Sequence, residues 1–396
     1  MAPPDIVCLS HVPWAFALER PREVMRRFAR DRHVFFVEEP VAAGTELRTV
    51  MRTVEPNVHV VSVELPAETS AEAIEVAHRR CIAALARDAE RPLLWVYAPS
   101  AMRAARDLDP SLLVYDCVAD HAARSGARPE EARDEADLLA RADLVFTAGT
   151  SLFEAKRARN VSTYPLPSSV DARHFAEAAP CSRRELGDLL AREPRVGFLG
   201  PIDDRVDLGL IDQLAAARPD VQLVLAGGLV GVTTWDLPNR PNVHWLGARE
   251  YAELPRQVAS WDVAIIPFRT DAATRRTEPS GLLACLAAGK PVVSTPLDEV
   301  TTLAERGLVA MVEPGGFVDA VDAALLGVRD PVITAMRTHA GAGLVARTSW
   351  DRTFHAMLRL VDEAALARAF ATRRRDRDRE NEGESKSESD RRVRSA

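Results

Sequence analysis

The fold of this chain is decided by a stretch in its second half, which reads Pro279-Ser280-Gly281-Leu282-Leu283-Ala284-Cys285-Leu286-Ala287-Ala288-Gly289-Lys290-Pro291-Val292-Val293-Ser294-Thr295. Pro279 and Ser280 can begin a helix, and Gly289 can end it immediately before a buried apolar strand. A short helix that leads into a continuous apolar strand is typical of a parallel α/β sheet. This stretch therefore predicts one helix–strand step of such a sheet.

The same step recurs along the chain, because short runs rich in Val, Leu and Ile are each followed by helical spacing. In the first half these runs are Ile6 to Leu9, Val34 to Val37, Val58 to Val63, Leu93 to Tyr97, Leu112 to Val118 and Leu144 to Thr147. In the second half they are Val196 to Leu199, Val221 to Ala226, Val243 to Leu246, Val263 to Phe268, Pro291 to Thr295 and Leu308 to Val312. Continuous runs suit strands that are covered on both faces. We therefore predict an α/β fold with two Rossmann-like, doubly wound parallel-sheet domains that face each other across a cleft.

The domain limits follow from the stretch that separates the two series. Asp171 to Ser182 leads into a Ser-x-x-Glu capping box that ends at Glu185, so we place a boundary near residue 178. The predicted units are residues 1–177, residues 178–349, a helix over 350–372 that returns toward the first domain, and a tail over 373–396. Most residues of the tail are charged, so we expect it to be disordered or to tether the chain to anionic lipid or a partner.

Composition excludes several classes of protein. The chain has 396 residues, of which 47% are hydrophobic and 28% charged, as in folded soluble proteins. A formal net charge of -7 gives no overall positive field, so general nucleic-acid binding is not expected. The five cysteines include no Cys-x-x-Cys pair, which points away from a zinc site or disulfide framework and favours the cytoplasm. Because no apolar run is long enough to span a membrane, membrane association would be peripheral.

The loop after the first predicted strand argues against a dehydrogenase. It reads Ser10-His11-Val12-Pro13-Trp14, whereas a dinucleotide fold needs Gly-x-Gly-x-x-Gly at this place. The start of the helix near Pro279 is a better ligand site. Backbone N–H groups of Ser280, Gly281 and Leu282 would face the cleft there and suit an anion such as the diphosphate of a nucleotide sugar. An ordinary capped helix is the alternative interpretation.

Further motifs extend this interpretation over nearly the whole chain, up to about Ala371. In chain order they are Arg20-Pro21-Arg22-Glu23-Val24-Met25, Val37-Glu38-Glu39-Pro40, Val114-Tyr115-Asp116-Cys117-Val118-Ala119-Asp120-His121, Ala142-Asp143-Leu144-Val145-Phe146-Thr147, Pro167-Ser168-Ser169-Val170-Asp171, Gly197-Phe198-Leu199-Gly200-Pro201-Ile202-Asp203-Asp204-Arg205-Val206-Asp207-Leu208, Asn242-Val243-His244-Trp245-Leu246-Gly247, Pro267-Phe268, Ala288 to Thr295, and Trp350-Asp351. Together they resemble the retaining GT-B glycosyltransferases of the fourth sequence family, in particular a branch linked to bacterial surface polysaccharide.

The resemblance implies that the C-terminal half binds a nucleotide-activated sugar, a UDP- or GDP-sugar, without a metal or other cofactor. Arg205 would face the donor diphosphate, because a planar guanidinium matches phosphate oxygens and keeps its charge. Pairing of Arg205 with Asp203, Asp204 or Asp207 is the alternative. The implied donor-binding residues are Gly200, Arg205, Glu278, Ser280, Gly281 and Leu282.

On the acceptor side, the polar residues that follow a buried strand are expected to reach the cleft. Asp120 and His121 are the predicted catalytic residues, since either could orient or deprotonate an acceptor hydroxyl. Asp116 and His11 are predicted to line the acceptor side. A helix-capping Asp and a surface His are the alternative interpretations.

The chain departs from the family pattern on the helix that ends at Gly289. The family usually has a lysine that balances the diphosphate charge and, three residues later, a glutamate that binds sugar-nucleotide hydroxyls. These positions are Gly281 and Ala284 in this chain. Glu278 and Arg276 lie one or two turns away and could substitute in part.

The function that this resemblance implies is transfer of a hexosyl group, with retention, to a saccharide or lipid-linked acceptor in polysaccharide or glycoconjugate biosynthesis. A phosphate oxygen of the donor could itself accept the acceptor proton. The enzyme would work in the cytoplasm and could bind peripherally at the inner membrane face. A non-catalytic GT-B relative that binds a glycan or a pathway partner, and a nucleotide-sugar epimerase, are the alternatives.

Overall fold

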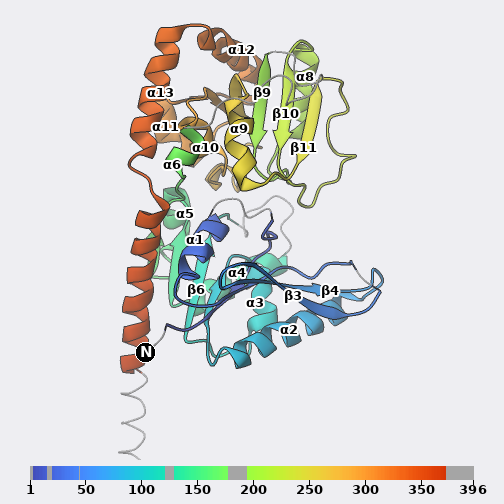
Figure 1. Cartoon of the computed structure of the whole chain (residues 1–396), viewed down its shortest axis with the longest axis vertical. Helices are drawn as coiled ribbons and strands as arrows, with labels where there is room; N and C mark the ends of the chain where they lie inside the picture. Colours follow the sequence, from blue (N-terminus) through green and yellow to red (C-terminus); the bar gives the residue numbers. More distant parts are fainter. Residues whose placement is uncertain (1–2, 16–19, 44, 121–128, 177–193, 372–396) are drawn as a thin grey trace, which may run out of the picture.

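The structure, a computed structural model, describes residues 3–15, 20–43, 45–120, 129–176 and 194–371. These residues form two α/β domains that are stacked along the long axis of the molecule (Figure 1). The predicted α/β class with two doubly wound domains is confirmed. The predicted boundary near residue 178 and the charged tail over 373–396 lie outside the described residues.

The first domain contains an eight-stranded sheet in the order β3-β4-β2-β1-β5-β6-β7-β8. Its strands are parallel except for β3, which pairs antiparallel with β4. Every predicted apolar run of this half forms a strand, and β3 and β8 are two strands that these runs do not include. The strands are β1 (Ile6–Leu9), β2 (Val34–Val37), β3 (Arg48–Glu55), β4 (Val58–Glu64), β5 (Leu93–Val96), β6 (Leu112–Cys117), β7 (Leu144–Thr147) and β8 (Thr163–Pro165).

Helices cover both faces of this sheet. One face packs against α2 (Ala71–Asp88), α3 (Met102–Ala105) and α4 (Pro129–Arg141), which contribute Ala77, Met102 and Leu138 to a common core. The other face packs against α1 (Arg20–Phe28). The short helix α5 (Thr150–Lys156) follows β7 directly. Because both faces are covered, the strands inside the sheet are mainly apolar along their length, as the continuous runs require, whereas β3 at the edge is largely exposed.

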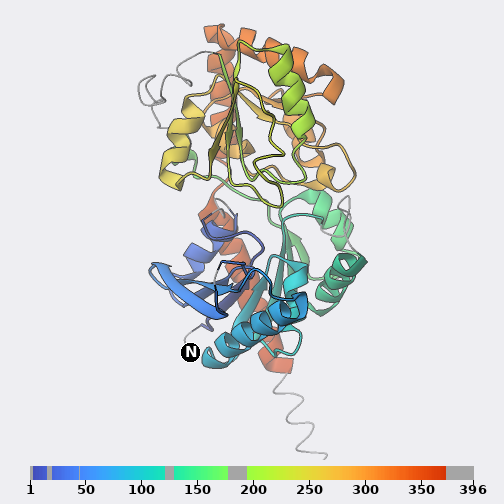
Figure 2. The ribbon, with the colours of Figure 1, turned by 90° about the vertical axis from the view of Figure 1, so that its right-hand side faces the viewer.

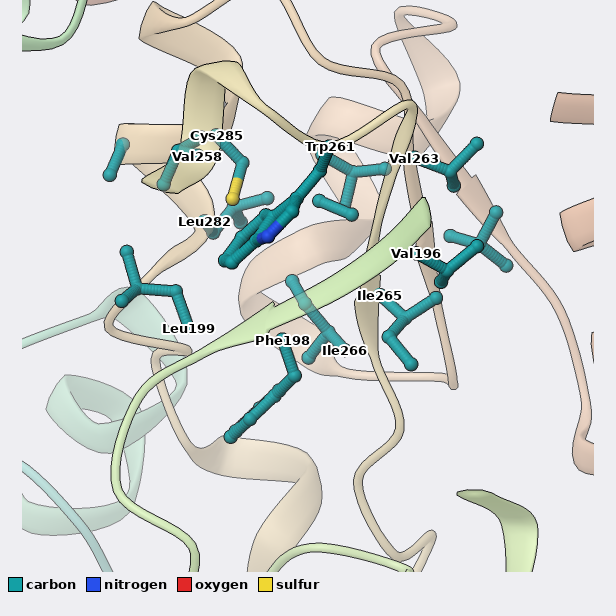
Figure 3. Packing of buried hydrophobic residues seen from close by; sticks show 14 of the residues in the cluster. Val196, Phe198, Leu199, Val258, Trp261, Val263, Ile265, Ile266, Leu282 and Cys285 are labelled. Atoms are coloured by element: carbon teal, nitrogen blue, oxygen red, sulfur yellow. The ribbon is translucent and has the colours of Figure 1, made fainter. Parts of the chain in front are cut away.

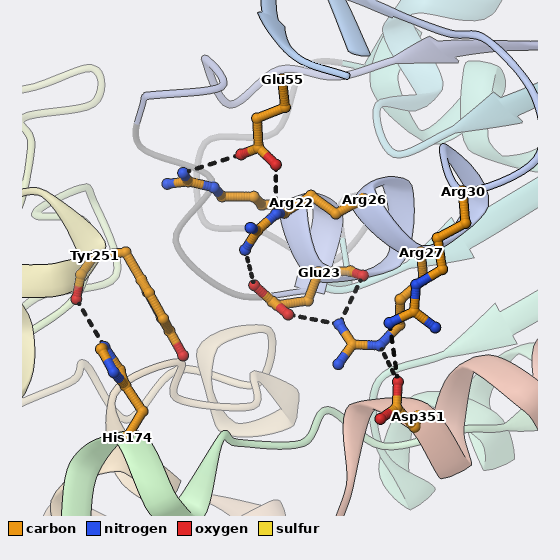
Figure 4. Close-up of polar contacts among 9 residues, drawn as sticks. All are labelled: Arg22, Glu23, Arg26, Arg27, Arg30, Glu55, His174, Tyr251 and Asp351. Carbon is orange, nitrogen blue, oxygen red and sulfur yellow. Dashed lines mark hydrogen bonds and ion pairs between the residues drawn. The ribbon is translucent and has the colours of Figure 1, made fainter. Parts of the chain in front are cut away.

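The end of the chain returns to the first domain. Residues 350–371 form a long helix that runs along the first domain beside α1 (Figures 1 and 2). The Phe354 ring meets Phe28 edge to face, with 4.9 Å between ring centroids. At the start of this helix Asp351 binds Arg27 of α1 at 2.8 Å, and Arg27 in turn binds Glu23 (Figure 4). The helix therefore fastens the second domain back onto the first.

The second domain contains a parallel six-stranded sheet in the order β11-β10-β9-β12-β13-β14. Each predicted apolar run of this half forms one of its strands. The strands are β9 (Arg195–Leu199), β10 (Gln222–Ala226), β11 (Val243–Gly247), β12 (Val263–Ile266), β13 (Val292–Ser294) and β14 (Val309–Met311). The helices are α8 (Leu208–Ala217), α9 (Leu254–Ala259), α10 (Leu282–Ala287), α11 (Thr301–Glu305), α12 (Phe317–Val328) and α13 (Pro331–Val345).

A tight contact in the core of this domain sets the position of β9. The indole of Trp261 lies between β9 and the helices that carry Val258 and Cys285 (Figure 3). A Cβ added to Gly197 of β9 would lie 1.9 Å from Cδ2 of Trp261, so glycine is required there. This packing holds the carboxyl end of β9, where Leu199 leads into the cleft between the domains.

The last helix before residue 177 packs against the second domain. The helix α6 (Ala172–Ala176) places Phe175 in the core of the second domain. The ring of His174 stacks on Tyr251 with 4.5 Å between centroids, and its Nε2 lies 3.1 Å from the Tyr251 carbonyl oxygen (Figure 4). Asp171 accepts a hydrogen bond from the backbone N–H of His174 at 3.2 Å, which is a structural role.

Candidate functional site

A cavity of about 250 Å³ lies between the two domains, where the strands of both sheets end. Loops after β1, β6 and β7 and the start of α1 form its first wall. Loops after β9, β10 and β12 and the segment before α10 form the opposite wall. The cavity is lined by His11, Val12, Arg20, Pro21, Val118, Ala119, Ala148, Ser168, Leu199, Gly200, Pro201, Asp203, Asp204, Arg205, Val230, Gly231, Leu254, Phe268, Glu278, Ser280 and Gly281.

Gly200 lines the cavity in a backbone conformation that favours glycine, with φ of +146°. The loop that follows β10 packs tightly against it. A Cβ added to Gly227 would lie 1.8 Å from the carbonyl oxygen of Gly200. The two loops therefore meet through their backbones, which leaves Gly200 at the cavity wall where a donor-binding role requires it.

Arg205 also lines the second-domain wall, and its guanidinium is held by Asp203. Its Nε lies 3.0 and 2.9 Å from the two carboxylate oxygens of Asp203, and its Cζ lies 5.8 Å from the centroid of the Phe268 ring. Burial alone would lower the pKa of Arg205, but the charge of Asp203 raises it. The pairing considered as an alternative is thus present. It fixes the guanidinium at the cavity, where 22% of the side chain stays exposed.

Glu278 lies on the same wall and reaches toward the segment that connects the domains. Its Oε2 accepts a hydrogen bond from the backbone N–H of Ser168 at 3.4 Å. Burial raises the pKa of Glu278 to about 7, although Ser168 and the charge of Arg20 act in the opposite direction. Near neutral pH, both the protonated and the ionised carboxyl are therefore available to a ligand in the cavity.

The helix after Glu278 begins later than predicted. Residues 280–281 form a turn, and α10 starts at Leu282 rather than at Pro279. The N–H of Leu282 donates to the carbonyl of Pro279 at 3.1 Å, and the Leu282 side chain is buried in the core of the second domain. Leu282, which was predicted to bind the donor, therefore does not line the cavity, and its N–H already has a partner. Ser280 and Gly281 do line the cavity.

The two positions that depart from the family pattern are both closed by packing. A Cβ added to Gly281 would lie 2.3 Å from the backbone carbonyl oxygen of Leu199. Ala284 is fully buried in the core of the second domain. Neither position has space for the lysine or glutamate of the pattern, so any donor must be bound by other groups of the cavity wall.

On the first-domain side, Asp116 does not line the cavity, in contrast to its predicted place on the acceptor side. Asp116 is fully buried on β6 and binds Arg20 of α1 at 2.8 Å. Arg20 also donates to the carbonyl oxygen of Leu166, and it lines the cavity while Asp116 lies behind it. The sequence around Asp116 does not predict this ion pair, because Arg20 is far away in the sequence. His11 lines the cavity, as predicted for the acceptor side.

Asp120 does not line the cavity either, and its carboxylate is fully engaged. One oxygen lies 2.7 Å from Nζ of Lys156, and the other lies 2.7 Å from Nη1 of Arg276 in the second domain. Burial would raise the pKa of Asp120, but the hydrogen bonds and charges of these two cations lower it. A carboxylate with a lowered pKa is a weak base, which argues against the predicted catalytic role. His121 lies outside the described residues.

Several residues reach the cavity wall without a role predicted from the sequence, among them Arg20, Ser168 and Phe268. Each stands within a motif that carries the resemblance, namely Arg20-Pro21, Pro167-Ser168 and Pro267-Phe268. Those motifs are the signal that could have found them.

Comparison with known proteins agrees with this geometry. Residues 193–327, which include most of the second-domain wall, match the family model for glycosyl transferases group 1. One relative is TuaH of Bacillus subtilis strain 168, which is named for a glycosyltransferase role in teichuronic acid biosynthesis. It is 28% identical over 171 residues, covering 41% of this chain and 42% of the relative.

A second relative comes from Corynebacterium glutamicum and is named a GDP-mannose-dependent monoacylated alpha-(1-6)-phosphatidylinositol monomannoside mannosyltransferase. It is 31% identical over 205 residues, covering 47% of this chain and 52% of the relative. The chain thus spans about half the length of the curated relatives that it matches.

Two solved structures show the likeness in fold. The sucrose-phosphate synthase of Thermosynechococcus elongatus superposes with a TM-score of 0.71 at 16% identity, covering 92% of this chain and 100% of that one. HepE of Anabaena, solved with UDP and glucose, superposes with a TM-score of 0.68 at 17% identity, covering 91% and 99%. The chain therefore has the GT-B fold, and its second domain carries the match to glycosyl transferases group 1.

Two further features concern the residues that the structure describes. None of the helices in that part of the chain is long and apolar enough to cross a membrane. In the same residues, no group of three or more His, Cys, Asp or Glu side chains is arranged to hold a metal ion.

Proposed function

We propose that this protein is a glycosyltransferase that moves a hexosyl group from a UDP- or GDP-sugar to a saccharide or lipid-linked acceptor in polysaccharide or glycoconjugate biosynthesis. The observation that carries the proposal is the cavity between two GT-B domains, with Arg205 and Glu278 on the wall of the domain that matches glycosyl transferases group 1. The donor is a substrate, and the reaction needs no resident cofactor. The protein would act in the cytoplasm, and at the inner membrane face when its acceptor is lipid-linked.

In this proposal Arg205 binds the diphosphate of the donor. Asp203 occupies the Nε edge of the guanidinium and fixes its plane, so little side-chain entropy is lost when phosphate oxygens bind the remaining N–H groups. Glu278 binds hydroxyl groups of the sugar or ribose, with Ser280 and Gly281 beside it. These groups take over the task of the lysine and glutamate that this chain does not have.

We also propose that the reaction proceeds with retention at the anomeric carbon. As the glycosidic bond to the phosphate breaks, negative charge develops on the leaving diphosphate, and Arg205 stabilises it. A phosphate oxygen of the leaving group then takes the proton of the acceptor hydroxyl as that hydroxyl forms the new bond. This route is supported by Asp120, since both of its oxygens already bind cations and its pKa is lowered.

The experiment is calorimetric titration of UDP and GDP, followed by transfer assays with radiolabelled UDP- and GDP-sugars and a bacterial glycolipid extract. Arg205→Gln should weaken binding of the preferred nucleotide by about tenfold or more, since a hydrogen bond to a charged group contributes about 1.5 to 3 kcal/mol. Arg240→Gln is the matched control, because Arg240 also pairs with an aspartate, Asp212, but on the surface of the domain.

Each outcome separates the candidates. Transfer of label to the extract supports a glycosyltransferase. Conversion of the donor without any acceptor would instead show an epimerase, and nucleotide binding without turnover would show a non-catalytic relative that binds a glycan or a pathway partner. Equal effects of Arg205→Gln and Arg240→Gln would contradict the position of the donor site.

A further inference from the structure

The two domains also touch outside the cavity, and several of these contacts involve one stretch of the second domain. This stretch runs from Arg276 to Glu299 and includes Glu278 of the cavity wall. Arg276 binds Asp120 of the first domain at 2.7 Å. At the other end of the stretch, Glu299 binds residues at the start of α5. Arg275, which directly precedes the stretch, forms an ion pair of 3.6 Å with Asp298 and so links the two ends to each other.

The carboxylate of Glu299 accepts hydrogen bonds from three donors of the first domain. Its Oε1 accepts from the backbone N–H of Ser151 at 2.7 Å and from the Ser151 hydroxyl at 2.6 Å, and its Oε2 accepts from the Thr150 N–H at 3.2 Å. Gly149 makes space for it, because an added Cβ would lie 2.2 Å from Cδ of Glu299. A side chain at position 149 is therefore incompatible with this contact.

The second contact is anchored deep in the first domain. Asp120, which is 4% exposed, shares Lys156 with the fully buried carboxylate of Glu135, at 2.7 and 2.9 Å. Glu135 also accepts a hydrogen bond from the Tyr115 hydroxyl at 2.9 Å. This chain of buried partners holds Asp120 in place before Arg276 reaches it, so the interdomain ion pair forms against a rigid support.

Both contacts converge on the short helix α5. Its first residues bind Glu299, and its last residue, Lys156, holds the aspartate that binds Arg276. The stretch that carries Glu278 is thus attached to the first domain at both ends. We name the Glu299–Ser151 and Arg276–Asp120 contacts together the interdomain latch.

We propose that Glu299 and Arg276 are positioning residues, which use the interdomain latch to hold the two walls of the cavity at the separation that the transfer reaction needs. The inference rests on the proposed glycosyl transfer for its kinetic consequence. Neither residue lines the cavity. Loss of the latch should therefore slow turnover while nucleotide binding, which depends on the second-domain wall, is preserved.

The sharpest variant is Gly149→Ala, which displaces the Glu299 carboxylate while Glu299 itself is unchanged. The backbone at Gly149 is extended, with φ of −154°, so alanine fits it without strain. Glu299→Gln weakens the same contact from the other domain. Gly315→Ala is the matched control, because a Cβ at Gly315 meets open space.

Small-angle X-ray scattering and kinetics test the latch together. We expect Gly149→Ala and Glu299→Gln to enlarge the radius of gyration, to lower kcat at least tenfold and to leave the Kd for UDP or GDP within about twofold of wild type. The double variant should be no worse than either single variant, since both remove one contact. Gly315→Ala should match wild type.

Unchanged scattering and turnover in both single variants, or additive losses in the double variant, would overturn the latch. Scattering decides this without any substrate. A wild-type protein that binds neither UDP nor GDP would instead contradict the proposed function, and the change in radius would still test the latch on its own.

Discussion

The raised pKa of Glu278 predicts a pH dependence of stability that a single substitution should remove. The carboxyl titrates at about 7 in the folded protein, against an ordinary value of 4.5. Between these two pKa values, the folded state keeps a proton that the unfolded chain has released. Well below pH 4.5 both states are protonated, so Glu278 does not lower the free energy of unfolding there. The free energy of unfolding therefore falls between about pH 4.5 and 7, and the loss levels off above the folded pKa at about 3 kcal/mol, when the buried carboxylate is ionised.

The perturbation is Glu278→Gln, which keeps the shape of the protonated carboxyl and cannot ionise. Urea unfolding at pH 5 and pH 8.5, followed by tryptophan fluorescence, gives the free energy of unfolding of both proteins. Between these two pH values the wild type should lose about 2 to 3 kcal/mol more than the variant. Subtracting the variant removes the contribution of other titrating groups. Parallel pH profiles would refute the reasoning, because they would mean that Glu278 titrates normally.

Two further substitutions test the packing around the cavity and the buried network behind it. Gly281→Ala should destabilise the protein by about 1 to 3 kcal/mol, seen as a lower Tm, because the new Cβ meets the backbone oxygen of Leu199. Wild-type stability in this variant would show that the turn can move away. Lys156→Met should cost about 3 to 5 kcal/mol at pH 7 in urea unfolding, because it removes the buried cation that Asp120 and Glu135 share. Lys156 helps to lower the pKa of Asp120, so that deficit should shrink at acidic pH, where Asp120 of the variant takes up a proton more readily than Asp120 of the wild type. A pH-independent deficit would contradict this.

The sequence predicts the strands of this fold well, because strands of a parallel sheet are apolar on both faces. The exceptions follow from the same physics. β3 is exposed along most of its length, pairs antiparallel with β4 at the edge of the sheet, and carries arginines among its apolar residues. No continuous apolar run is needed in such a strand. β8 has three residues, too few to show any period.

The candidate site is less predictable, because side-chain direction depends on distant partners. Gly200, Arg205 and Glu278 reach the cavity since each follows a strand or precedes a helix at the carboxyl end of the second sheet. Asp116 and Asp120 stand at a similar place in the first sheet and turn inward instead. Asp116 pairs with Arg20, which is 96 residues away, and Asp120 pairs with Arg276, which is 156 residues away. Local spacing holds no information on contacts of that range.

Packing in the second domain explains why Gly281 and Ala284 depart from the family pattern. Gly281 has no side chain because the carbonyl of Leu199 occupies that space, and Ala284 is small because it packs within the core. Simply restoring lysine and glutamate at these positions would introduce a clash and a buried charge rather than a donor site. The compensating change must therefore lie elsewhere on the cavity wall. Glu278 is an acidic residue on that wall. It belongs to the same segment as Gly281, because it shortly precedes the turn at residues 280–281.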